Sequence, residues 1–191
     1  MATELYLLRH GETAWTISGQ HTGISEIPLT PNGEEEARKS GEKLRAIGFS
    51  KVFTSPRIRA RRTCELAGLG PLAEVCEDLH EWLYGDYEGL LPKEIQQRHP
   101  GWDVFQHGCP HGETPEQVSQ RADRVLDMIK KIDGKVGVVS HGHFSRALAM
   151  RWIKLPITHG AVLESSTASI SILGFSKNSG KPLIKLWNQT N

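Results

Sequence analysis

Three short, mostly apolar runs, at residues 5–8, 52–55 and 136–140, have the composition of buried β-strands. The first run stops at Arg9 and His10, the second leads into an arginine-rich stretch, and the third ends at His141. In an open α/β sheet, ligands bind at the carboxyl ends of the strands. We therefore expect these three strand ends to bring histidine and arginine side chains to one edge of a sheet.

Helical and strand-like patterns alternate along the rest of the chain. Apolar residues at helical spacing predict helices at 31–47, through 61–66, at 115–129 and at 143–153, and Thr30 and Thr114 stand where N-caps belong. Period-two alternation predicts further strands at 72–79, 168–173 and 183–187. Together these elements predict an α/β fold, a three-layer sandwich with a mostly parallel central sheet and helices on both faces.

Two long stretches lack this regularity. Residues 11–31 form a polar loop, and residues 81–114 are rich in Gly, Pro, His and aromatic residues, with one short helix expected after Pro92. Long loops of this kind often carry function. We expect residues 1–191 to form a single domain in which about 81–114 is a lid over the site.

Composition narrows the classes of partner and compartment. Lys and Arg number 23 against 22 Asp and Glu, so the net charge of +1 favours neither nucleic acid nor an anionic membrane. The chain starts without a signal-like segment, and no apolar run approaches a membrane span. Its three cysteines have no paired spacing, which predicts free thiols and a cytoplasmic protein.

The Arg9-His10 pair gives the clearest chemical indication. A guanidinium group binds phosphate or carboxylate through a planar fork, and imidazole suits nucleophilic or proton-transfer work near neutral pH. The alternative is an ordinary histidine at a strand end.

Two sequence strings could be interpreted as metal sites, one at 107–111 and the other at His141-Gly142-His143. Neither has a full ligand set at a characteristic spacing, so no metal is expected.

Four motifs together resemble the histidine phosphatase superfamily, also called phosphoglycerate mutase-like. They are Leu-Arg-His-Gly-Glu-Thr at 8–13, Ser-Pro-Arg-Ile-Arg-Ala at 55–60, the Leu-x-Glu…Gly-x-x-Glu-Gly segment at 79–89, and His-Gly-His at 141–143. The resemblance extends from residue 5 to about 187. It implies a phosphomonoesterase that needs no metal and no cofactor and acts on a small phosphorylated metabolite.

The same resemblance assigns roles to individual residues. It implies a phosphohistidine on His10, phosphoryl binding by Arg9 and Arg59, a hydrogen bond to the phosphoryl group from His141, and Glu81 as general acid and base. The residues expected to contact the substrate are Thr16, Gln20, Thr22, Gly23, Tyr84, Gly142 and His143. Many family members carry asparagine at the position of Thr16, so that contact is altered here. Glu88 and Glu113 are expected to brace the structure.

Three functional hypotheses stay open. The adjacent arginines of cofactor-dependent phosphoglycerate mutases are missing at 102–108, which favours a phosphatase over a mutase. The resemblance is strongest to a phosphatase subgroup that includes bacterial acid phosphatases labelled phosphoglycerate mutase and fungal sedoheptulose-1,7-bisphosphatases. Lys93, Arg98, His107 or His111 would then be candidates to meet a second phosphate. The third hypothesis is an inactive phospho-ligand binding module, and edge strands near the C-terminus would allow a homodimer.

Overall fold

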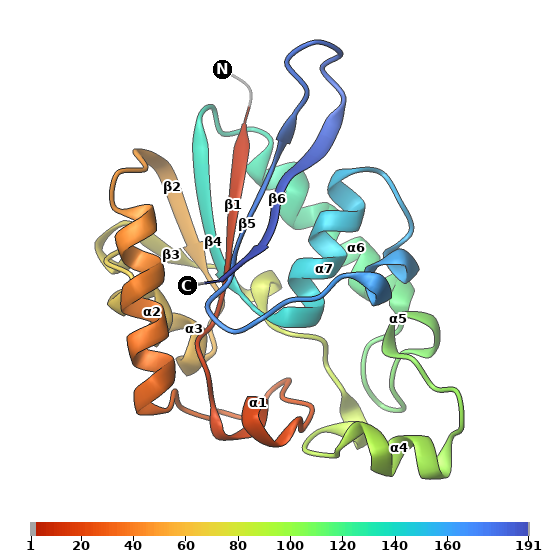
Figure 1. Ribbon diagram of the computed structural model, residues 1–191. Coiled ribbons are helices and arrows are strands. Elements are labelled where there is room, and N and C mark those ends of the chain that lie inside the picture. Colours follow the sequence, from red (N-terminus) through yellow and green to blue (C-terminus); the bar gives the residue numbers. More distant parts are fainter. Residues whose placement is uncertain (1–2, 191) are drawn as a thin grey trace.

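Six strands form one sheet in the order β3-β2-β4-β1-β5-β6 (Figure 1). The computed structural model describes residues 3–190. The strands are β1 (Glu4–Arg9), β2 (Phe49–Thr54), β3 (Ala73–Val75), β4 (Lys135–Ser140), β5 (Ile170–Phe175) and β6 (Pro182–Gln189). The pairs β1–β4, β2–β4 and β2–β3 are parallel, whereas β1–β5 and β5–β6 are antiparallel. The prediction of a mostly parallel sheet is therefore confirmed.

Helices cover both faces of this sheet. Figure 1 shows α2 (Pro31–Leu44) and α3 (Ile58–Leu66) on one side, and α6 (Pro115–Ile129) and α7 (Gly142–Trp152) on the other. Successive side chains of β1 point to opposite faces. Leu5 and Leu7 belong to the core under α6 and α7, and Tyr6 and Leu8 to the core under α2 and α3. Burial on both faces explains why this strand is an unbroken apolar run.

The two predicted N-caps are confirmed. The Thr30 hydroxyl accepts a hydrogen bond from the Gly33 N–H at 3.0 Å, at the start of α2. Thr114 accepts from the Gln117 N–H at 3.2 Å, and the Gln117 side chain accepts in return from the Thr114 N–H at 2.8 Å. This reciprocal pair is a capping box that fixes the start of α6.

Some predicted boundaries were wrong. The strand expected at 72–79 is only β3, followed by a 3-10 helix at Glu77–Leu79. It lies at the edge of the sheet and pairs with β2 alone, so Val75 stays about half exposed, as does Leu72 in the 3-10 helix just before it. Two helices of five and four residues, α1 (Ala14–Ser18) and α5 (Val104–His107), lie in the stretches expected to be irregular. They are too short to show a period.

The stretch 81–114 lies at the end of the molecule where β1 ends. With α4 (Pro92–Arg98) and α5, it sits beside α1 in Figure 1. In the described part of the chain, no helix combines the length and apolar character needed to cross a bilayer. Cys64, Cys76 and Cys109 are free thiols. The strand β6 pairs with β5 only, so the homodimer through an edge strand stays a prediction.

Candidate active site

A pocket of about 350 Å³ opens at the carboxyl ends of the central strands. It draws residues from β1, the α1 loop, the 81–114 stretch and α7. Of the residues predicted from the sequence, it is lined by Arg9, His10, Thr16, Gln20, Thr22, Glu81, Tyr84, Gly142 and His143. Arg59 and His141 are fully buried and do not line it. Parts of the chain far apart in sequence thus meet at the predicted edge.

His10 is held in one orientation at the end of β1. Its Nδ1 lies 2.8 Å from the Gly11 carbonyl oxygen, which can only accept, so Nδ1 carries the proton. Burial, and after it the positive charges of Arg59 and Arg9, hold the pKa of His10 well below its usual range. The ring is therefore neutral, and Nε2 keeps its lone pair. Nε2 makes no hydrogen bond to any described residue.

Three buried nitrogen atoms near His10 have no hydrogen-bond partner. In residues 3–190, five buried side-chain atoms lack one, and Arg9 Nε, Arg59 Nε and His141 Nδ1 are among them. Buried polar atoms are nearly always paired, so each exception calls for an explanation. The His141 ring centroid lies 5.2 Å from that of His10. Unpaired nitrogens on two guanidinium groups and an imidazole fit a site that takes up an anion.

Main-chain carbonyls fix both arginines. Arg59 Nη1 donates to the Ser25 carbonyl at 2.8 Å, and Nη2 donates to the carbonyls of Thr22 and Gly23 at 3.0 Å each. Arg9 Nη1 donates to the Ser165 carbonyl. A methyl group placed on Gly142 would lie 3.3 Å from the Arg9 guanidinium carbon, so a larger residue there would displace Arg9.

Glu81 sits at the N-terminus of α7. Its Oε1 accepts from the Trp82 and Phe144 N–H groups at 2.8 and 2.9 Å, and its Oε2 accepts from the His143 N–H at 2.9 Å. The helix start thereby fixes the carboxylate beside His10 in the pocket wall. Because Oε2 accepts a single hydrogen bond, it keeps a lone pair on which a proton can be taken up or given back.

The buried Tyr84 and the partly exposed His143 form a hydrogen-bonded pair in the pocket wall. The Tyr84 hydroxyl lies 2.6 Å from His143 Nδ1. Burial raises the pKa of Tyr84 well above its usual value, whereas burial and the charge of Arg146 hold the pKa of His143 well below. Tyr84 therefore donates its proton to Nδ1, and His143 presents Nε2–H as a free donor.

Several residues predicted to bind substrate are held by the protein itself. The Thr16 hydroxyl closes a capping box with Thr13, accepting from its N–H at 2.8 Å. Gln20 Nε2 donates to the Gly89 carbonyl at 2.8 Å, and the Thr22 hydroxyl donates to the Gln20 carbonyl at 3.2 Å. The Gly23 N–H donates to Glu88 at 2.9 Å, and Gly23 is not in the pocket wall.

Two carboxylates brace the loops around the site. Glu88 accepts from the N–H groups of Gly23 and Ser25, which ties the first loop to the 81–114 stretch. Glu113 forms a bidentate ion pair with Arg121 on α6, at 2.8 and 2.7 Å. Arg121 Nη1 in turn donates to the main-chain carbonyls of Asp78 and His80. The two glutamates thus fix main-chain segments that lie next to the predicted catalytic residues.

Three residues that had no predicted role also lie at the site. Ser55 lies 2.7 Å from His141 Nε2, His21 packs at 4.7 Å between ring centroids against Tyr84, and Arg146 lines the pocket from α7. Arg146 follows His143 by three residues, one helical turn, and that spacing was a signal for it. A methyl group on Gly11 would lie 2.3 Å from the Gly33 carbonyl oxygen, so glycine at this position allows the start of α2 to approach closely.

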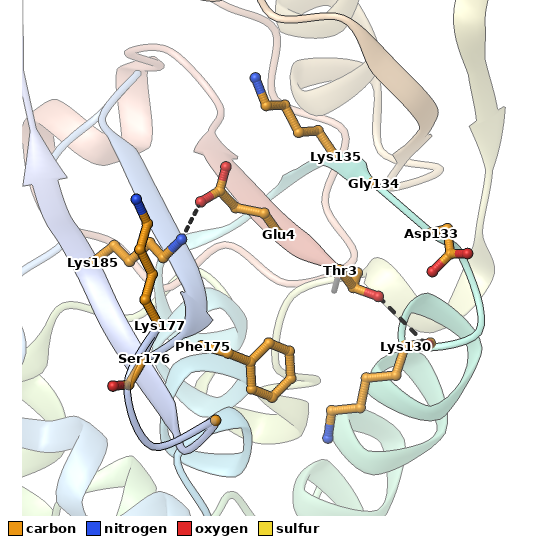
Figure 2. Close-up of a pocket in the computed structure, with 11 residues that line it drawn as sticks. Thr3, Glu4, Lys130, Asp133, Gly134, Lys135, Phe175, Ser176, Lys177 and Lys185 are labelled. Atoms are coloured by element: carbon orange, nitrogen blue, oxygen red, sulfur yellow. Dashed lines mark hydrogen bonds and ion pairs between the residues drawn. The ribbon is translucent and has the colours of Figure 1, made fainter. Parts of the chain in front are cut away.

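A larger groove, of about 760 Å³, lies away from this chemistry. Figure 2 shows it near the start of β1, with Phe175 and four lysines: Lys130, Lys135, Lys177 and Lys185. One of them, Lys185, is already paired with Glu4 at 2.5 Å (Figure 2). None of the predicted catalytic residues lines this groove. Within residues 3–190, no three His, Cys, Asp or Glu side chains are grouped to hold a metal ion.

Comparison with known proteins gives consistent matches. A model described as the histidine phosphatase superfamily (branch 1) matches residues 5–190. An acid phosphatase of Mycobacterium tuberculosis is 45% identical over 175 residues, covering 90% of this chain and 86% of the relative. A sedoheptulose 1,7-bisphosphatase of Saccharomyces cerevisiae is 35% identical over 184 residues, covering 79% and 68%. The solved structure of a Mycobacterium tuberculosis open reading frame matches with a TM-score of 0.94 and 42% identity over 98% of each chain. Other matching relatives are named phosphoglycerate mutases.

Proposed function

This chain belongs to the histidine phosphatase superfamily, branch 1, and we propose that it is a metal-independent phosphomonoesterase acting through phospho-His10. The observation that carries the proposal is the neutral His10 ring with an unbonded Nε2, close to three buried nitrogens that lack partners. Phosphoryl transfer needs mainly positioning and stabilisation of charge on the equatorial oxygens. Two arginines and an imidazole N–H meet that need, with no cofactor.

The reaction has two displacements. His10 Nε2 attacks phosphorus, the bond from phosphorus to the ester oxygen breaks, and Glu81 gives a proton to the leaving alcohol. Water then attacks the phosphohistidine, Glu81 takes a proton from it, and the bond from phosphorus to nitrogen breaks, releasing phosphate. Glu81 thus ends the cycle protonated as it began.

Hydrogen bonds within the protein determine which N–H groups of Arg9, Arg59 and His141 remain free to bind the phosphoryl group. Arg9 and Arg59 bind the phosphoryl oxygens through their free Nε–H groups. Ser55 donates its hydroxyl proton to His141 Nε2, so that Nδ1–H of His141 donates to a phosphoryl oxygen. Ser55 is therefore a positioning residue. Its hydroxyl also accepts from the Arg57 N–H at 3.3 Å, which leaves its proton directed at the histidine.

The alternative is a phosphoglycerate mutase, in which the phosphoryl group returns to a sugar acid instead of water. No adjacent arginine pair stands at 102–108, and that stretch turns Val104 and Phe105 into the core. This supports hydrolysis. The third hypothesis, an inactive binding module, is disfavoured by the presence of all five catalytic candidates.

We also propose that the substrate is a small phosphorylated metabolite and that the chain forms one domain with a lid at 81–114. We propose a reducing, cytoplasmic setting, which the three free thiols support.

Phosphate release without added metal tests the proposal. The substrates are p-nitrophenyl phosphate, 3-phosphoglycerate, fructose 1,6-bisphosphate and sedoheptulose 1,7-bisphosphate. We expect release by the wild type and by a control, His159→Ala, whose side chain is exposed and lies outside the pocket, and none by His10→Ala. Undiminished release by His10→Ala would refute the mechanism. Isomerisation of 3-phosphoglycerate that requires added bisphosphoglycerate, without release, would identify a mutase.

The role of Glu81 needs a separate measurement. Brief incubation with a radiolabelled ester, followed by quenching, traps an acid-labile and alkali-stable phosphohistidine. Glu81→Ala should slow hydrolysis of alkyl phosphates more than that of p-nitrophenyl phosphate, whose leaving group needs no proton. With p-nitrophenyl phosphate it should accumulate phosphoenzyme, because water lacks its base. Equal losses for both ester classes would argue against Glu81 as the acid.

A further inference from the structure

The last strand of the sheet ends level with the phosphoryl site. Because β5 is antiparallel to β1 and β6 is antiparallel to β5, β6 runs parallel to β1 and ends at the same edge of the sheet (Figure 1). In these pairings, Ile170 of β5 lies opposite both Leu8 of β1 and Gln189 of β6. The final residues of β6 are therefore level with the end of β1, where Arg9 and His10 stand.

A bulge in β6 directs a side chain away from the strand pairing. Where β5 has the single residue Ser171, β6 has two, Trp187 and Asn188, which we call the β6 bulge. Asn188 has a φ of 55°, a left-handed conformation that asparagine adopts more readily than most residues, and its N–H donates to the Ser171 hydroxyl at 3.0 Å. Bulges re-aim side chains, and the side chain of Asn188 reaches the loop at 163–169.

The two side chains of the β6 bulge hold this loop on either side of Ser165. The Oδ1 of Asn188 accepts from the Ser166 N–H at 2.7 Å, and its Nδ2 donates to the Ser166 hydroxyl at 3.2 Å. Trp187 Nε1 donates to the Glu164 carbonyl at 2.6 Å. The loop contains no helix or strand of its own, so bonds of this kind fix the direction of its carbonyl groups.

Ser165 is the point where the loop meets Arg9. Arg9 Nη1 donates to the Ser165 carbonyl, and within residues 3–190 this is the only hydrogen bond that the Arg9 side chain makes. Arg9 Nε is buried and has no partner, and Ser165 also lines the pocket. Because a single hydrogen bond fixes the guanidinium, its direction depends on where the Ser165 carbonyl stands.

We propose that the β6 bulge positions Arg9 for phosphoryl binding, with Asn188 and Trp187 as positioning residues that act through the Ser165 carbonyl. The inference rests on the proposed function, since it takes the Nε–H of Arg9 to bind the phosphoryl group. Neither residue of the bulge lines the pocket. They hold the loop so that Nη1 stays bonded and Nε–H stays directed at the phosphoryl oxygens. Without them the Ser165 carbonyl shifts and the guanidinium turns.

A double-mutant cycle with Arg9 tests this coupling. Asn188→Gly removes both side-chain hydrogen bonds and keeps the left-handed backbone, which glycine adopts readily. We expect kcat/KM for p-nitrophenyl phosphate to fall about tenfold in Asn188→Gly, and to fall no further when the same substitution is added to Arg9→Ala. A purely structural role of Asn188 would lower kcat/KM in both backgrounds.

A control and a second variant guard against loss of the fold. Gln189→Gly changes the next residue of β6, whose exposed side chain bonds to nothing within residues 3–190, and should leave kcat/KM unchanged. Trp187→Phe keeps an aromatic ring and removes only the donor to the Glu164 carbonyl, so we expect a smaller fall, again absent in Arg9→Ala. Urea unfolding shows which variants are folded, and Trp187→Phe takes the place of Asn188→Gly in the cycle if the latter is not.

Calorimetric titration with inorganic phosphate separates the inference from turnover. The Kd for phosphate should rise about tenfold in Asn188→Gly relative to wild type, and stay the same between Arg9→Ala and the double variant. That result supports the positioning role even if no ester is hydrolysed. An equal change in both backgrounds, or none in either, would overturn the inference and leave the proposed function standing. A wild type that binds no phosphate would overturn both.

Discussion

Replacing Glu113 with alanine would leave the Arg121 guanidinium buried without its counter-charge. The side chains of the two residues are only 11% and 3% exposed, and two hydrogen bonds of 2.8 and 2.7 Å join them. The substitution also removes the acceptor of the Leu83 N–H. Breaking a buried pair by deleting one partner costs about 3–5 kcal/mol, a large share of the roughly 5–15 kcal/mol by which a domain is stable.

Urea unfolding at pH 7, followed by tryptophan fluorescence, measures this cost. The matched control is Asp123→Ala, which removes an equally bidentate pair with Arg151, at 2.8 and 2.9 Å, from the same helix α6. Its side chains are 44% and 31% exposed, so the expected loss is about 0–1 kcal/mol. Similar losses in the two variants would refute the reasoning from burial.

The same substitution should also impair catalysis. Arg121 donates to the carbonyl of His80 at 2.7 Å and contacts that of Glu81 at 3.4 Å, so it fixes the main chain that carries the proposed acid. In the absence of urea, folded Glu113→Ala should therefore lose kcat on alkyl phosphates more than on p-nitrophenyl phosphate. A uniform loss across leaving groups would mean that the pair has only a structural role.

Three further predictions concern metal, packing and pH. Activity should be unchanged by EDTA after exhaustive dialysis, and a loss restored by a divalent cation would refute the metal-free mechanism. Gly33→Ala should lower the melting temperature while Gly48→Ala does not, because the added methyl group would lie 2.1 Å from the Glu12 carbonyl oxygen at the first site and meets nothing within 4 Å at the second. Burial first, and then the arginine charges, lower the pKa values of His10 and His141, so protons bind the unfolded state more tightly. The free energy of unfolding should therefore be highest above the usual histidine pKa of about 6.5. As the pH falls below that value, it should drop by up to about 1.4 kcal/mol per pH unit for each histidine. A free energy of unfolding that stays constant from pH 7 to 5 would contradict this.

The pattern of apolar and polar residues along the chain was sufficient to predict the layers of the fold and the position of the site. The run at 5–8 predicted a strand covered on both faces, and Thr30 and Thr114 predicted two helix starts, because these signals depend on neighbours in sequence. The residues after the three predicted strands indicated the edge where Arg9, His10 and His141 meet, since parallel strands share one carboxyl edge, whereas Glu81 was assigned by the family resemblance alone. The short helix α1 was not predicted, and the bounds of the edge strand β3 were wrong, because these elements contain too few residues to show a period.

The tertiary structure alone decided how these groups work. Ser55 and His141 are 86 residues apart, and Arg121 reaches the main chain of His80 across 41, so no local pattern could have paired them. The protonation of His10 follows from a carbonyl beside Nδ1 and from burial near two arginines, which depend on packing. Arg146 belongs to the site because the turn of α7 and the lining of the pocket place it there. The sequence determined which chemical groups are present, whereas the packing determined which of them lie in contact and which remain free to bind.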